Sequence, residues 1–147
     1  MKNTVKKDVK KGVGKRGNVG GGGIVVRYHV EEHPSFFRMA PFRVLEAART
    51  VADEINKLLG NRKLRLIHRA QLRDSAQSIA ANIREGMGRK PGPHRHRSYR
   101  DARGSAEETD EHLRANFADA RIAAAAYHRI HNRITLVVKM LSTIVGD

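Results

Sequence analysis

The apolar residues that follow Pro41 recur at spacings of three and four, the period that places side chains on one face of an α-helix. The pattern runs in four segments, from about Phe42 to Leu59, Leu72 to Met87, His96 to Phe117 and Ala123 to Ile144. The positions that we expect to face inward are Phe42, Leu45, Ala48, Ala52, Ile55, Leu59, Leu72, Ala76, Ile79, Ile83, Met87, Tyr99, Ala102, Ala106, Leu113, Phe117, Tyr127, Ile130, Ile134, Val137, Leu141 and Ile144.

The breaks between these segments are short and carry residues that end helices. Gly60 and Asn61 follow the first segment, and Pro91-Gly92-Pro93 separates the second from the third. Short links favour antiparallel neighbours, and no strand pattern competes with the helical one. We therefore predict an all-α fold, an antiparallel up-and-down four-helix bundle over residues 41–145.

Small residues line the third segment, among them Ala102, Gly104, Ala106 and Ala115. Such residues let a neighbouring backbone come close but bury little apolar area. A bundle of about 105 residues is also at the small end for a stable domain. We therefore expect contacts with other helices or other subunits to hold this helix, and self-association to stabilise the bundle.

Residues 1–38 differ in composition from the rest of the chain. Residues 1–33 hold eight Lys and Arg against three Asp and Glu, a net charge of +5, together with seven of the 13 glycines. This segment has too little apolar area to offset its conformational entropy, so we predict a disordered basic tail. Residues 24–30 have a strand-like composition but no second strand to pair with. The alternative is that translation begins at Met39, which would leave residues 1–38 untranslated.

The composition of the whole chain narrows the choice of partner. Its 147 residues include 29 Lys and Arg against 15 Asp and Glu, a formal net charge of +14. Such a surface favours a polyanion such as RNA or DNA. Aromatic residues are only 5% of the chain, so contacts to phosphates are expected rather than base stacking. The absence of cysteine excludes disulfides and thiolate zinc sites, and it fits the cytoplasm that we expect. Since no apolar run is long enough to span a bilayer, we expect no membrane partner.

One segment, from the end of the second helix to the start of the third, concentrates positive charge. It contains seven Lys and Arg residues, and its only acidic residues are Glu85 and Asp101. Arginine presents a planar fork suited to phosphate oxygens, so we predict a nucleic-acid-binding surface at one end of the bundle. The predicted contacts are Arg84, Arg89, Lys90, Arg95, Arg97, Arg100 and Arg103. The alternative is a solvated arginine-rich surface with no ligand.

Four acidic residues follow directly within Glu107–Glu111. This order places cations at the start of a helix and anions later, which opposes the helix dipole. One interpretation is that the basic patch of one subunit contacts the acidic patch of the next, head to tail, which closes a ring. The alternative is that the acids serve solubility alone.

Evidence for catalysis in the sequence is weak. The segment Gly86–Lys90 lacks the Gly-Lys-Ser/Thr ending of a phosphate loop and follows a helix. The histidine pairs, His94 with His96 and His128 with His131, lack an obvious third metal ligand. The spacings Arg62–His68 and Arg121–His128 are similar to the ribonuclease motif of HEPN domains, but a chain so rich in Arg and His produces them by chance. We expect no catalytic residue, metal or cofactor.

A polar stripe runs beside the apolar face of the second helix, formed by Ser78, Asn82 and Glu85. Buried polar groups need partners, and a pairing of Glu85 with Arg103 would fix the register of two helices. We assign structural roles to Asn82, Glu85, Gly86 and Gly104.

These same residues resemble a known family. The segment Ser78–Arg89, S-I-A-A-N-I-R-E-G-M-G-R, and the segment Ala102–Ser105, A-R-G-S, resemble the bacterial four-helix bundle proteins, also called 23S ribosomal RNA intervening-sequence proteins. Tyr127 and Met140-Leu141 fall at matching offsets, and the resemblance covers about residues 42–145. Four positions depart from the family's pattern: Ala80 replaces a proline, Met87 an aromatic residue, and Ala106 and Thr109 leucines.

The resemblance carries functional expectations with it. The family is similar to the accessory protein of diversity-generating retroelements, a homopentameric ring that binds nucleic acid and a reverse transcriptase. The resemblance therefore implies a pentamer with a basic surface. It makes a reverse transcriptase a possible partner, but it does not imply that this chain serves a retroelement. We expect a non-enzymatic homo-oligomer that binds RNA or DNA. The alternatives are an adaptor that recruits an acidic protein and a HEPN-like ribonuclease.

Overall fold

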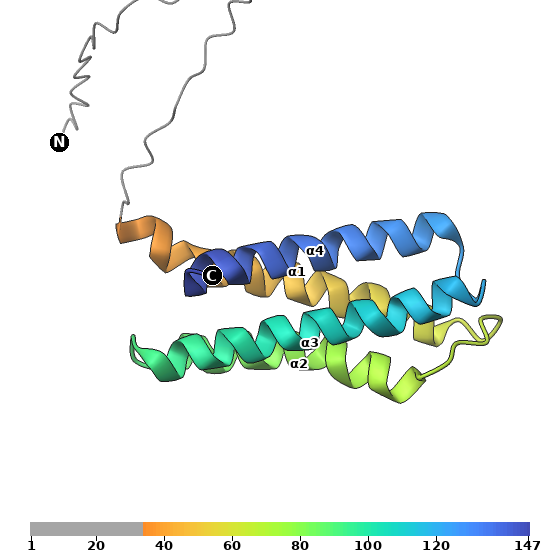
Figure 1. The fold of residues 1–147 in the computed structure, drawn as a ribbon, viewed down its shortest axis with the longest axis horizontal. Helices are drawn as coiled ribbons and strands as arrows, with labels where there is room; N and C mark the ends of the chain where they lie inside the picture. Colours follow the sequence, from red (N-terminus) through yellow and green to blue (C-terminus); the bar gives the residue numbers. More distant parts are fainter. Residues whose placement is uncertain (1–33) are drawn as a thin grey trace, which may run out of the picture. The chain divides into compact units, whose positions relative to one another are not determined.

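A computed structural model describes residues 34–147, with side chains from Met39 onward. Four α-helices make up this part of the chain: α1 (Pro34–Gly60), α2 (Arg69–Gly88), α3 (Pro93–Ala118) and α4 (Ala124–Val145). Each packs against its two neighbours in an antiparallel square, α1 against α2 and α4, and α3 against α2 and α4 (Figure 1). The predicted all-α bundle is confirmed. Residues 1–33, which hold most of the predicted tail, lie outside the described residues.

The first helix begins at Pro34, earlier than the periodicity after Pro41 indicates. Proline suits the first position of a helix, because the N–H that it lacks would have no intrahelical acceptor there. Pro41 lies inside α1, where it removes one helical hydrogen bond. The sequence analysis treated this second proline as the start. Residues 34–38, assigned to the tail, are therefore helical.

Most of the predicted inward positions form the core. The largest fully buried side chains include Tyr99, Ile55, Leu72, Leu113 and Ile130. Phe42 was predicted to be buried, and this was wrong, since 59% of it is exposed. Phe42 and Ala48 are separated by two successive steps of three residues through Leu45. Six residues at 100° each place Phe42 about 120° around the helix axis from Ala48, which is outside the buried stripe. Val44 and Val51, both fully buried, occupy the core stripe of α1 instead.

The interface between α2 and α3 has polar groups in its interior. Thr109 is fully buried. Its hydroxyl is hydrogen-bonded to the Ser75 hydroxyl at 3.0 Å and donates to the Ser105 carbonyl at 2.7 Å. Asn82 donates from Nδ2 to the Ser105 Oγ at 3.4 Å. Of the predicted polar stripe of α2, Asn82 therefore meets a polar partner on α3, whereas Ser78 lines the groove between α1 and α2 and Glu85 pairs with Arg89.

Two glycines with predicted structural roles have opposite surroundings. A Cβ on Gly86 would lie 2.5 Å from Cε1 of Tyr99, so only glycine lets the Tyr99 ring pack on α2. Gly104 is exposed, and a Cβ there would meet no atom within 4 Å. The expectation that Gly104 admits a neighbouring backbone is therefore not met by any helix of residues 34–147.

At one end of the bundle, the loop between α1 and α2 is tied to the end of α3. The fully buried Asn116 accepts a hydrogen bond from the Ile67 N–H at 2.8 Å and donates to the Ile67 carbonyl at 3.1 Å. Arg121, between α3 and α4, donates to the Arg65 carbonyl at 2.6 Å. These bonds hold the two loops side by side. None of the helices in the described residues has the length and apolarity to cross a bilayer.

Candidate nucleic-acid interface

The predicted basic surface centres on the turn between α2 and α3. Gly92 has φ 143°, a conformation that side chains rarely adopt, and Pro93 then begins α3. A shallow depression of about 250 Å³ lies on this turn, lined by Arg89, Lys90, Pro91, Gly92, Pro93 and His94. The turn thus presents cations from the end of one helix and the start of the next.

Arg95 holds this turn in place. Its Nε donates to the Arg89 carbonyl at 2.9 Å, and its Nη2 contacts the same oxygen. A carbonyl is a neutral acceptor, so the guanidinium keeps its full positive charge beside the turn. Arg95 therefore combines a structural contact with a charge that remains available to an anion.

Arg100 and Arg103 face the end of α4 instead of the turn. Arg100 lies 3.3 Å from Oδ1 of Asp147, and Arg103 lies 2.9 Å from Oδ2 of the same carboxylate. Arg103 also donates to the Ser142 hydroxyl at 3.2 Å. Hydrogen bonds from Arg100, and then from Arg103, lower the pKa of the Asp147 carboxyl. One carboxylate thus offsets part of the charge of both predicted contacts.

The predicted pairing of Glu85 with Arg103 was wrong. Glu85 forms its ion pair with Arg89, four residues later and just past the end of α2. A partner four residues away in the sequence is reached without fixing two helices against each other. Arg103, on the face of α3 next to α4, pairs with Asp147 and lies 4.0 Å from Glu107. Both are surface contacts of small energy.

The remaining three predicted contacts are exposed: Arg84, Lys90 and Arg97. None of the ion pairs formed within residues 39–147 includes them. Arg84 lies apart from the turn, in a groove of about 570 Å³ between α1 and α2 that also holds Arg49, Asp53 and Asp74. The structure therefore gathers Arg89, Lys90, Arg95 and Arg97 at the turn and distributes the other predicted cations over two further faces.

The sequence analysis did not predict a charge cluster that forms around the buried Asp110, between α3 and α4. Asp110, 9% exposed, lies 2.6 Å from Nδ1 of His131 and 2.6 Å from Nη2 of Arg114. The His131 ring stacks on Tyr127. The Tyr127 hydroxyl and then Asp110 raise the pKa of Arg114. The four-residue spacing of Asp110 and Arg114 was visible in the sequence, whereas the contact with His131 depends on the register of two helices.

Two of the residues considered for catalysis have contacts within the bundle. Arg121 pairs with Asp119 at 3.3 Å and with the Arg65 carbonyl, while His128 lies edge-on to the Phe117 and Tyr127 rings. Within residues 39–147, no group of three His, Asp or Glu side chains could hold a metal ion.

The sequence and the fold are both similar to known proteins. The model of a family described as 23S rRNA-intervening sequence protein matches residues 41–143. A crystal structure of a protein of unknown function from the S23 ribosomal protein family of Bacteroides thetaiotaomicron superposes with a TM-score of 0.69 and 25% sequence identity. The match covers 74% of this chain and 100% of that one. No curated protein matches the chain.

Proposed function

The chain belongs to the 23S rRNA-intervening sequence protein family, and from its charge and the geometry of the α2–α3 turn we propose that it is a non-enzymatic homo-oligomer that binds RNA or DNA through phosphates. The observation that carries this proposal is a large excess of cations whose charge is not cancelled. Of the net charge of +14, five units belong to residues 1–33 and nine to residues 34–147. We propose the cytoplasm as its compartment.

The principal contact surface in this proposal is the turn itself, formed by Arg89, Lys90, Arg95 and Arg97. Lys90 and Arg97 are exposed and outside the ion pairs of the described residues, and the partner of Arg95 is a neutral carbonyl. Arg100 and Arg103 contribute less, because Asp147 lies between them and an approaching phosphate would meet its negative charge. Binding through phosphates predicts little dependence on base sequence and a steep loss of affinity with salt.

The test is a charge reversal at the turn with a matched control. Lys90→Glu with Arg97→Glu changes two exposed side chains and leaves Arg95 to hold the turn. Arg43→Glu with Arg133→Glu makes the same change of net charge at exposed positions of α1 and α4. We expect the turn variant to bind a short RNA at least tenfold more weakly than the control variant. Its plot of log affinity against log salt should also flatten by about 1.4 for two lost single-strand contacts.

Two outcomes would overturn parts of this proposal. Equal affinities for the turn variant and the control would remove the turn as the contact surface. Failure of the nuclease-treated wild-type protein to bind either RNA or DNA at low salt would remove nucleic-acid binding altogether.

Self-association is supported by apolar side chains on the surface. Met39, Phe42 and Leu136 are each more than half exposed, and contact with another copy of the chain would remove their apolar area from water. We expect light scattering to give a mass five times that of the 16.5 kDa chain. A monomer at micromolar concentration would refute the oligomer without affecting the binding experiment.

A further inference from the structure

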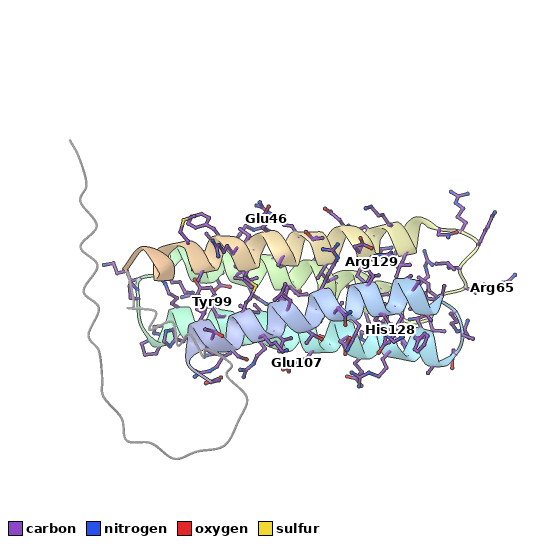
Figure 2. All side chains as sticks on the ribbon, turned by 90° about the horizontal axis from the view of Figure 1, so that it is seen from above. Glu46, Arg65, Tyr99, Glu107, His128 and Arg129 are labelled. Carbon is purple, nitrogen blue, oxygen red and sulfur yellow. The ribbon has the colours of Figure 1, made fainter. Side chains whose placement is uncertain are left out.

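The end of the bundle opposite the α2–α3 turn carries a second group of cations, which we name the loop-end cluster. They come from the last turn of α1, the α1–α2 loop, the first turns of α2 and the α3–α4 loop. The cluster consists of Lys57, Arg62, Lys63, Arg65, Arg69, Arg73 and Arg121. Figure 2 shows Arg65 at the far end of the bundle from Tyr99, which lies near the α2–α3 turn.

The loop-end cluster keeps more of its charge than the segment predicted from the sequence. Arg69 donates to the Leu59 carbonyl, and Arg121 donates to the Arg65 carbonyl at 2.6 Å. Both acceptors are neutral. Asp119, 3.3 Å from Arg121, is the only carboxylate within residues 39–147 that pairs with any of the seven. At the α2–α3 end, by contrast, three of the seven predicted cations form ion pairs. Their acidic partners are Glu85, Glu107 and Asp147.

The cluster is also held in a defined arrangement. Asn116 fixes the loop through both backbone groups of Ile67, and the Arg121 bond ties the loop to the segment before α4. The side chains of Lys57, Arg62, Lys63, Arg65 and Arg73 are exposed around these fixed points. Cations that are far apart in the sequence therefore present one surface, and a phosphate backbone would meet it with little reordering of the protein.

We propose that the loop-end cluster is a second phosphate-binding surface and that the protein bridges two segments of nucleic acid, one at each end of the bundle. This inference rests on the proposed function. Helix α2, with 20 residues, separates the two ends by about 30 Å. That distance is nearly four times the Debye length of about 8 Å at physiological salt, so the two surfaces bind phosphates independently.

Acidic residues between the ends favour two segments over one strand that runs along the bundle. Glu107, Glu108 and Glu111 are exposed on α3, and Figure 2 shows Glu107 about midway along the bundle. In the groove between α1 and α2, Asp53 and Asp74 offset the charges of Arg49 and Arg84. A strand lying along either of these faces would pass carboxylates, whereas each end offers cations.

A bridging assay tests this inference. A biotinylated 20-base-pair RNA duplex is immobilised, and the protein's capture of a second, fluorescent duplex of the same length is measured beside its affinity for one duplex in solution. The loop-end variant is Arg62→Glu with Lys63→Glu, two exposed side chains of the loop that form no ion pair within residues 39–147. The turn variant and the Arg43/Arg133 control are those described above, and melting temperatures verify folding.

We expect the loop-end variant to bind one duplex within about fourfold of the control, because the turn is intact, and to capture at least tenfold less of the second duplex. The turn variant should lose capture to the same degree. Normal capture by the loop-end variant, as would occur if copies in an oligomer bridged through their turns alone, overturns the inference. Wild-type protein that binds one duplex but captures no second one also overturns it and leaves the proposed function standing. Wild-type protein that binds neither RNA nor DNA overturns both.

Discussion

The contact between Gly86 and Tyr99 makes a prediction with a built-in control. A Cβ at position 86 would lie 2.5 Å from Cε1, 2.9 Å from Cδ1 and 3.0 Å from Cζ of Tyr99. The ring is 1% exposed, so it has no open space to move into. Gly86→Ala should therefore push α2 and α3 apart. The same substitution at Gly104 meets no atom within 4 Å.

The two substitutions should change stability in opposite directions. Overpacking a core by a methyl group costs about 1–3 kcal/mol, while alanine in place of glycine inside a helix contributes about 0.5–1 kcal/mol. We expect Gly86→Ala to lose about 1–2 kcal/mol and Gly104→Ala to gain up to about 1 kcal/mol. The difference between the variants, about 2 kcal/mol, corresponds to roughly 10 °C in melting temperature for a domain of this size.

Thermal unfolding followed by far-UV circular dichroism measures this difference, at one fixed protein concentration because oligomers unfold in a concentration-dependent way. An unchanged or higher melting temperature for Gly86→Ala would refute the packing argument. A clear loss for Gly104→Ala, with a fall in the mass measured by light scattering, would show that another copy of the chain contacts this position and that its open surroundings are a property of the single chain.

Three further predictions concern Asp147, Tyr99 and Asn116. The Arg100 guanidinium lowers the pKa of the Asp147 carboxyl, so the pair stabilises the fold above that group's ordinary pKa of about 4 and ceases to do so as the pH falls through the lowered value. The difference in melting temperature between wild type and Asp147→Asn should therefore be constant near neutral pH and disappear in acid. A difference that grows in acid would contradict this sign. Tyr99→Phe should raise the free energy of unfolding by up to about 1 kcal/mol in urea titrations. The buried hydroxyl has no hydrogen-bond partner within the described residues, and such a group costs about 1–3 kcal/mol. A marked loss of stability would show that the hydroxyl forms a hydrogen bond in solution. Asn116→Ala should lower the free energy of unfolding by about 2–4 kcal/mol in the same titrations, because it leaves both backbone groups of Ile67 without their partner. A loss below about 0.5 kcal/mol, the size of a neutral surface change, would mean that other contacts hold the loop.

The helices and most of the core could be predicted from the sequence because their signal is local and repeated. Leu72, Ala76, Ile79 and Ile83 keep the period of a helix over three turns, and all four are buried. The prediction failed where few residues carried the pattern. Phe42 stood at the edge of its segment, where the drift of a three-residue spacing is not corrected by further turns.

The partners of charged side chains could not be predicted in the same way. The contact of Arg103 with Asp147 joins residues 44 positions apart, and that of Asp110 with His131 joins residues 21 positions apart. Both depend on which faces of α3 and α4 meet and on their register. The sequence offered Glu85 as a partner for Arg103, but it could not show that Arg89, the residue that follows α2, pairs with Glu85 instead.

The distribution of charge follows from this packing more than from the order of residues. In the sequence, cations are concentrated from Arg84 to Arg103, and the only acids inside that segment are Glu85 and Asp101. Folding brings Asp147 to that segment and reduces its charge. The same process gathers Lys57, Arg73 and Arg121 at the opposite end, with carbonyls as acceptors for two of the arginines there. A carbonyl acceptor orients a guanidinium without cancelling its charge, so the end that looks less basic in the sequence is the one that the fold leaves more positive.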